Sequence, residues 1–254
     1  MRTPMSRLRL YVIACKVFEQ ELAVLAAGAK TEARIQYLEI GLHTGPAEQH
    51  RVALQSAIDA VATGRFDAIA LAYGLCNRGI VGLQARTLPV VIPRAHDCIG
   101  MLLGSSQRYL AELESHPGTY FQSPGWVEHL PADHMLRQQN LPVGPGLKMT
   151  REDLVARYGE ENAAYLLEQL TGFTRHYCRL AYISTPVPQA ENHERAAAEI
   201  ARQQGWTFDR LPGDLGWLRR LLDGDWTEQE FLKLKPGERL GLRYDSQLIA
   251  AEPP

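Results

Sequence analysis

The sequence predicts an α/β protein: a parallel, Rossmann-like sheet with helices on both faces, followed by a smaller second α/β half. Short apolar runs such as 8–14 (LRLYVIA) and 67–73 (DAIALAY) have the continuous hydrophobicity of strands that are buried on both faces of a sheet. Segments with apolar residues at helical spacing, such as 47–63, alternate with these runs. This strand–helix–strand alternation is typical of a parallel sheet.

The first half, residues 1–125, contains the clearest alternation. Strands are expected at 8–14, 35–40, 67–73 and 88–93, and helices at 19–29, 47–63 and 99–114. The second of these helices is expected to stop at Gly64, because glycine is common just after a helix. Residues 116–126 combine turn-forming and aromatic residues, which favours a loop that covers a site.

The second half, residues 126–254, repeats the pattern on a smaller scale. Proline, glycine and asparagine cluster between about residues 118 and 148, which places the boundary there. Helices are expected at 150–171, 192–204 and 214–222, strands at 180–184 and 207–211, and a short strand pair or extended edge between 231 and 249.

Composition excludes several classes of protein. The chain has 27 Lys and Arg against 29 Asp and Glu, a net charge of −2, which argues against a nucleic-acid partner. The longest apolar runs are too short to span a bilayer, so no membrane partner is expected. The basic and then apolar N-terminus lacks a small-residue cleavage site, so we interpret it as a first strand and expect a cytoplasmic protein. In that reducing compartment, cysteines serve as ligands, nucleophiles or packing residues more often than as disulfides.

Three cysteines share one kind of position, because Cys15, Cys76 and Cys98 each follow a predicted strand. The carboxyl ends of parallel strands form one rim, where ligands bind, so we expect the three thiols to converge there as metal ligands. Three thiolates can hold zinc with an open fourth position, or a [4Fe–4S] cluster with one iron left for substrate. A single catalytic thiol and simple packing are the alternatives. Cys178 precedes its strand and is interpreted as structural.

Charged and aromatic neighbours complete the predicted site. Basic side chains near the thiols would offset thiolate charge, and an adjacent histidine and carboxylate could move protons. The candidate catalytic residues are His96, Asp97 and Lys16, and the candidate substrate-binding residues are Arg94, Arg78, Tyr120 and Trp126. The two arginines would hold an anionic group of a small-molecule substrate.

Four longer motifs run through the chain: ACKxFE (14–19), YGLCxxG (73–79), IPRAHDCIxxLLGS (92–105) and PGTYxxSPGW (117–126). Together they resemble the bacterial and archaeal family catalogued as domain of unknown function 1638, over nearly the whole chain. Asn77 departs from the pattern, where a glycine is expected. Members of that family often accompany corrinoid proteins and their methyltransferases, so the resemblance implies a role in methyl-group metabolism.

The combined hypothesis is a metal-dependent enzyme or accessory protein of corrinoid-linked one-carbon metabolism, with transferase or lyase/hydrolase-type chemistry. Its three-cysteine centre (zinc, or a [4Fe–4S] cluster) would activate a small anionic or thiol substrate. The alternative is a non-catalytic metal or cofactor delivery protein that docks on a corrinoid protein or methyltransferase. A third hypothesis is a nucleotide-binding enzyme that uses the glycine-rich segment 74–82 without metal.

Overall fold

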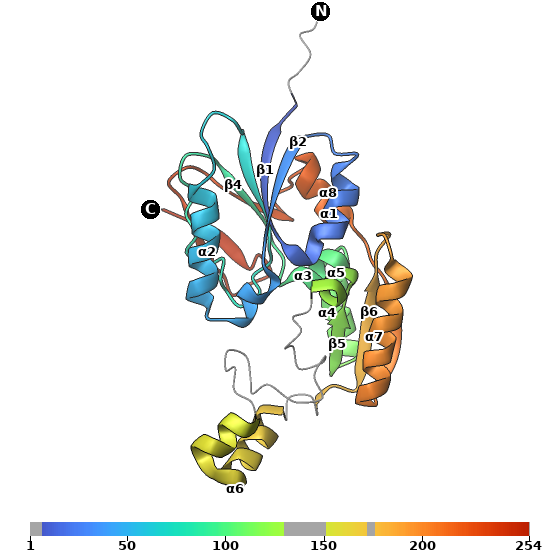
Figure 1. Ribbon diagram of the computed structural model, residues 1–254. Helices are drawn as coiled ribbons and strands as arrows, with labels where there is room; N and C mark the ends of the chain where they lie inside the picture. The colour runs from blue at the N-terminus through green and yellow to red at the C-terminus, as the bar shows by residue number, and fades with distance from the viewer. Residues whose placement is uncertain (1–6, 130–150, 172–175, 254) are drawn as a thin grey trace, which may run out of the picture.

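The computed structural model describes residues 7–129, 151–171 and 176–253, and it confirms an α/β fold with a mostly parallel main sheet (Figure 1). The strand order of the main sheet is β2-β1-β3-β4-β8. These strands are β1 (Arg9–Cys15), β2 (Glu32–Leu38), β3 (Ala68–Ala72), β4 (Val90–Pro93) and β8 (Phe231–Leu234). The first four are parallel to their neighbours, and β8 pairs antiparallel with β4.

Helices cover both faces of the main sheet, as predicted. Helix α2 (Ala47–Asp59) lies on one face, and α1 (Glu19–Ala26) and α8 (Gly216–Asp223) lie on the other. Every residue of β3 and β4 is buried, because their apolar runs are enclosed from both sides. For β3, the continuous hydrophobicity of residues 67–73 predicts such a strand, buried on both faces.

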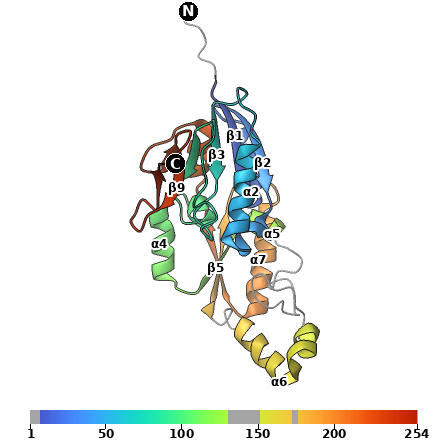
Figure 2. The same cartoon turned by 90° about the vertical axis from the view of Figure 1, so that its left-hand side faces the viewer.

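A second parallel sheet, of order β5-β6-β7, lies beyond the carboxyl edge of the main sheet (Figures 1 and 2). Its elements are β5 (Thr119–Gln122), β6 (Arg179–Ser184) and β7 (Thr207–Pro212), with α5 (Pro124–His129) after β5 and α7 (Ala190–Gln204) between β6 and β7. The prediction of a covering loop at 116–126 is therefore wrong. Its aromatic residues belong to a strand and a helix: Phe121 is buried, and Tyr120 packs on Tyr177 and Trp206.

The chain passes from the main sheet to the second sheet and back again. The boundary expected after residue 125 falls inside α5, and β5, which precedes that boundary, belongs to the second sheet. Later, β8 returns to the main sheet and pairs with β4. The second sheet is therefore built from a segment whose two ends are both anchored in the main sheet.

The single helix predicted at 99–114 is wrong, because two helices occupy this stretch: α3 (Cys98–Leu102) and α4 (Ser106–Ser115). The break is at Gly104, which has a φ of +83°, a left-handed conformation that glycine adopts readily. A Cβ there would lie 2.6 Å from the Asp214 carboxyl carbon. Ser105 then caps α4 by accepting from the Arg108 N–H.

The remaining described elements lie outside the two parallel sheets. They are η1 (Lys16–Phe18), η2 (Ile40–Thr44), α6 (Arg151–Thr171) and the antiparallel pair β9 (Arg239–Leu242) and β10 (Ile249–Glu252). Helix α6 is interrupted at Gly159, which has a φ of +79°. Within the described ranges, no helix combines the length and apolar character that a membrane crossing requires.

A buried carboxyl group joins α1 to the loop after β6. Glu21 is fully buried, and its Oε1 accepts a hydrogen bond of 2.7 Å from the Thr185 hydroxyl. Its Oε2 has no hydrogen-bond partner among the described residues. Burial raises the pKa of Glu21 above its ordinary value of 4.5, because the charged form is poorly solvated there.

We expect Glu21→Gln to stabilise the protein above the ordinary carboxyl pKa. Between the ordinary pKa of 4.5 and the raised folded-state pKa, Glu21 is ionised in the unfolded chain but protonated in the folded chain. The free energy of unfolding therefore falls as pH rises through this range. Gln can still accept from Thr185 and carries no charge. Urea unfolding at about pH 8 and about pH 4.5 should show a stability gain that shrinks at the lower pH. An equal gain at both values would contradict the prediction, and Glu114→Gln, on the exposed surface, serves as the control.

Candidate functional site

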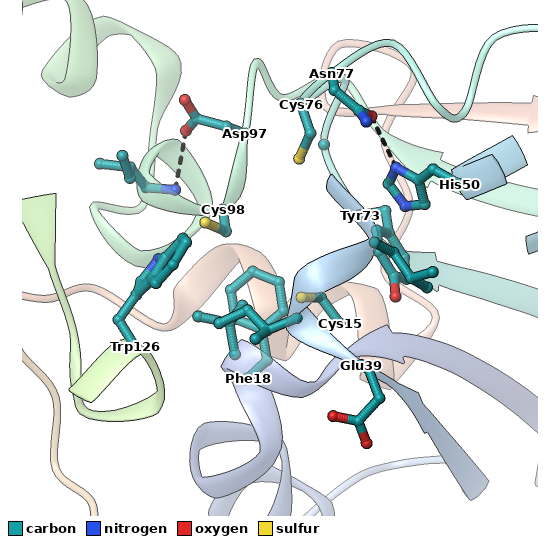
Figure 3. A pocket seen from close by; sticks show the side chains of 15 residues that line it. Cys15, Phe18, Glu39, His50, Tyr73, Cys76, Asn77, Asp97, Cys98 and Trp126 are labelled. Carbon is teal, nitrogen blue, oxygen red and sulfur yellow. Dashed lines mark hydrogen bonds between the residues drawn. The ribbon is translucent and has the colours of Figure 1, made fainter. Parts of the chain in front are cut away.

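Three thiols lie at the carboxyl ends of three adjacent strands. Cys15 is the last residue of β1, Cys76 lies in the loop after β3, and Cys98 begins α3 after β4. Because β1, β3 and β4 are consecutive in the sheet, these positions are neighbours in space. Figure 3 shows the three sulfur atoms on different sides of one shared space.

That space is a cavity of about 260 Å³. Three thiols, several apolar side chains and a smaller set of polar groups line it. The lining residues are Cys15, Val17, Phe18, Glu39, Ile40, Leu42, His50, Tyr73, Gly74, Cys76, Asn77, Asp97, Cys98, Ile99 and Trp126. The cavity is larger than one metal ion requires and has room for a small molecule beside the thiols.

The loop that carries Cys76 is held in a strained conformation. Cys76 has a φ of +45° and Arg78 a φ of +66°, in the left-handed region that residues other than glycine rarely adopt. Two backbone hydrogen bonds fasten the loop to the segment after β4: Leu75 N–H to Ala95 O at 2.8 Å and Cys76 N–H to His96 O at 2.7 Å. These bonds offset the strain and turn the Cys76 thiol toward the cavity.

Gly74 permits this close approach of the two loops. A Cβ at Gly74 would lie 2.6 Å from the Asp97 Cα, so a larger residue would push the loops apart. On the other side, the Asp97 carboxylate caps α3 by accepting from the N–H groups of Ile99 and Gly100 at 2.9 and 3.1 Å. The cap fixes the start of α3 and with it Cys98.

Helix α5 of the second sheet supplies the aromatic wall beside Cys98. Gly125 allows this helix to pack directly on η1, since a Cβ there would lie 1.9 Å from the Val17 carbonyl oxygen. Trp126 follows and lines the cavity with Phe18. The cavity is therefore lined by segments that follow the main-sheet strands and by helix α5, which follows β5 of the second sheet.

The three thiols are protonated at neutral pH in the absence of a cation. Burial, with Glu39 nearby, raises the pKa of Cys15 to about 11. Burial, Asp97 and Cys15 together raise the pKa of Cys76 to about 12. Burial, Asp97 and the other two thiols raise the pKa of Cys98 well above its ordinary value, although a hydrogen bond from Trp126 opposes this. A thiolate at one cysteine would raise the pKa of the other two. A bound cation would offset this repulsion and allow all three thiols to ionise.

The chemistry of the donor set fits zinc or an iron–sulfur cluster, since both are held by Cys thiolates. In the part of the chain that the structure describes, no three His, Cys, Asp or Glu side chains are arranged around one point as metal ligands. The sulfurs instead surround the cavity. A single ion would require the thiols to turn inward, whereas a cluster takes each thiol on a separate iron.

Of the other predicted site residues, Asp97 and Trp126 line the cavity, and five do not. Lys16 pairs with Glu39 at 3.3 Å, and His96 contributes its carbonyl to the Cys76 loop. Arg78 is exposed.

Arg94 and Tyr120 are engaged elsewhere. The Arg94 guanidinium donates to the carbonyl oxygens of Glu228, Gln247 and Ile249 at 2.9, 3.0 and 2.5 Å, so it holds the C-terminal segment. Tyr120 packs in the aromatic cluster of the second sheet. Cys178 is exposed, with its sulfur 4.0 Å from the Gly118 carbonyl oxygen, and it does not line the cavity.

Sequence reasoning missed a polar wall made by His50, Tyr73 and Asn77. His50 is fully buried on α2, and its Nδ1 lies 2.8 Å from Asn77 Oδ1. Tyr73 follows β3 and is 3% exposed. Asn77 could have drawn attention, because it is the departure from the YGLCxxG motif pattern. No local signal marks His50, since a lone histidine on a helix does not reveal which loop it will meet.

The comparisons with known proteins give one match. The family model described as "Protein of unknown function (DUF1638)" matches residues 37–222. This range contains Cys76, Cys98 and Trp126 and begins after Cys15. The searches of curated proteins and of solved structures gave no match.

Proposed function

Because this chain belongs to the DUF1638 family, a family of unknown function, we propose a function from the site itself: a metal-dependent enzyme that acts on a small molecule. In this proposal Cys15, Cys76 and Cys98 hold one metal centre at the carboxyl edge of the main sheet, and the substrate occupies the adjoining cavity. The observation that carries the proposal is the convergence of three thiols, from the ends of three adjacent strands, on one cavity.

Both candidate groups remain part of the proposal. The spread of the sulfurs around the cavity favours a [4Fe–4S] cluster, while zinc requires the thiols to move together. When bound, either group would supply a Lewis-acidic position to a substrate atom. Phe18 and Trp126 would exclude water from that position, which strengthens electrostatic interactions inside the cavity.

The cavity favours catalysis over metal delivery. A delivery protein must release its cargo to a partner, whereas these thiols, of which Cys15 is buried and the other two are half-buried, adjoin a space of about 260 Å³ with room for a substrate. The link to corrinoid-dependent methyl metabolism, and to a corrinoid protein or methyltransferase as partner, rests on the family resemblance. It would make the occupant of the cavity a participant in one-carbon chemistry.

The test is metal analysis with a visible spectrum, on protein purified without oxygen. Wild type is compared with Cys98→Ser and with the control Cys178→Ser, whose thiol lies away from the cavity. We expect about four irons per chain with a brown colour if the centre is a cluster, or about one zinc per colourless chain. Cys98→Ser should lose most of the metal and Cys178→Ser none. Absence of metal in wild type, or equal metal in Cys98→Ser, would overturn the proposal.

A further inference from the structure

The polar wall of the cavity (His50, Tyr73 and Asn77) has no part in holding the thiol centre. It presents two buried polar atoms, His50 Nε2 and the Tyr73 hydroxyl, which have no hydrogen-bond partner among the described residues. Both side chains line the cavity, and their rings are 5.4 Å apart between centroids. Buried polar atoms without partners are rare in folded proteins and indicate a missing partner.

The hydrogen bonds of Asn77 determine which nitrogen of His50 carries the proton. The Asn77 amide nitrogen donates to the Gly45 carbonyl oxygen at 3.1 Å, and its Oδ1 accepts from the Gly79 N–H at 3.0 Å. Oδ1 is therefore the atom that faces His50 Nδ1, and Nδ1 must donate to it. Burial lowers the pKa of His50, so the ring is neutral. Nε2 is left as a hydrogen-bond acceptor.

Gly79 leaves room for the His50 ring in this position, because a Cβ at Gly79 would lie 2.2 Å from His50 Nδ1. Tyr73 supplies the complementary group. Its phenol hydroxyl can donate a hydrogen bond. The wall thus offers one acceptor and one donor in the same cavity lining.

The side chains that line the cavity disfavour an anion as its occupant. Glu39 and Asp97 are the ionisable carboxyl groups among the described lining residues, and no Lys or Arg is among them. Of the two arginines expected from the sequence to bind an anion, Arg94 donates to three backbone carbonyls, and Arg78 is exposed and does not line the cavity. Lys16, the candidate catalytic cation, pairs with Glu39. Apart from the proposed metal centre, an anion in the cavity would therefore meet low polarity without a positive side chain.

We propose that the cavity binds a small uncharged molecule with an apolar body and a terminal hydroxyl or thiol. That this molecule is the substrate of a thiol-bound metal centre rests on the function proposed above. Its X–H group donates to His50 Nε2, and its X atom accepts from the Tyr73 hydroxyl. The apolar body lies against Phe18, Ile40 and Trp126. This replaces the anionic substrate that the nearby arginines suggested in the sequence.

The test measures binding of three probes of similar size by ligand-observed NMR: 1-butanol, butanoate and diethyl ether. The first is uncharged and has an O–H, the second is an anion, and the third has no donor. Wild type, His50→Asn and Tyr73→Phe are compared. In His50→Asn the amide nitrogen can replace Nδ1 as donor to Asn77 while Nε2 is removed. Tyr73→Phe removes a hydroxyl that has no hydrogen-bond partner among the described residues.

We expect wild type to bind 1-butanol at least about tenfold more tightly than butanoate or diethyl ether. Each variant should weaken 1-butanol by about tenfold. His50→Asn should leave diethyl ether unchanged, because the ether has no proton to donate to Nε2. Butanoate binding as tightly as 1-butanol, or equal 1-butanol affinity in all three proteins, would overturn the proposal. If a variant is unfolded by circular dichroism, the other variant decides.

Metal content, measured on the same samples, separates this inference from the proposed function. His50→Asn and Tyr73→Phe should retain wild-type metal, because neither residue is a proposed ligand. If wild type contains no metal but prefers 1-butanol, the proposed metal centre is overturned and the uncharged-ligand proposal stands. If wild type contains metal but prefers butanoate, the uncharged-ligand proposal is overturned and the metal centre stands.

Discussion

Cys76→Gly is expected to abolish binding at the proposed metal centre and to leave the fold intact. Cys76 has a φ of +45°, a conformation that costs roughly 1 kcal/mol for a residue with a Cβ and little for glycine. Relief of this strain offsets the lost packing and the greater freedom of glycine in the unfolded chain. The unfolding free energy should therefore stay within about 1 kcal/mol of wild type. Metal affinity should fall by at least about 100-fold, more than loss of an outer-shell contact causes.

Arg78→Gly is the matched control for this variant. Arg78 lies two residues farther along the same loop, with a φ of +66°, so glycine relieves the same kind of strain and all three thiols remain. Urea unfolding and metal titration of the two variants separate the loop from the ligand. Loss of metal in both variants would assign the effect to loop conformation, and retention in both would contradict the ligand role of Cys76.

Gly125→Ala is expected to give the largest loss of stability among single-methyl changes at this site. Its Cβ would lie 1.9 Å from the Val17 carbonyl oxygen and 2.7 Å from the Val17 carbonyl carbon. Backbone cannot move aside as a flexible side chain does, so α5 and η1 must separate. We expect the unfolding free energy to fall by about 3 kcal/mol or more. The tryptophan fluorescence of the folded state should also change, because Trp126 would move away from Cys98.

Gly41→Ala provides the comparison, since a Cβ at Gly41 has no atom within 4 Å. It should change the unfolding free energy by at most about 0.5 kcal/mol, as surface substitutions usually do. Urea unfolding followed by fluorescence measures both variants under one condition. Equal stability of Gly125→Ala and Gly41→Ala would show that α5 does not depend on this close contact.

The central strands and the meeting of the thiols could be predicted because they depend on local pattern and one rule of topology. Strands β3 and β4 are enclosed on both faces, so their sequences are continuously apolar. The carboxyl ends of parallel strands share an edge, so Cys15, Cys76 and Cys98 could be placed together without any short spacing motif. The edge strand β2, which is only partly buried, was predicted at 35–40 and lies at 32–38.

What could not be predicted depends on contacts between distant segments. Arg94 looks like a substrate ligand beside the cysteines, but segments more than a hundred residues later place carbonyl oxygens around its guanidinium. The hydrogen bond between His50 and Asn77 joins a helix to a loop. The sequence around either residue gives no indication that the two will meet. The break at Gly104 depends on Asp214 in the same way.

The return of β8 to the main sheet has a consequence for the order of events during synthesis. By Cys98 the ribosome has made β1 to β4 and all three thiols, but α5 with Trp126 follows later, and β8 comes only after the whole second sheet. An emerging chain therefore carries a complete set of ligands on an unfinished sheet, with the β4 edge still unpaired. A cell that fills the proposed centre would have to supply metal to the nascent chain or keep the thiols reduced until translation ends. For such a centre, the timing of metal supply, as well as affinity, would govern how much of the protein is loaded.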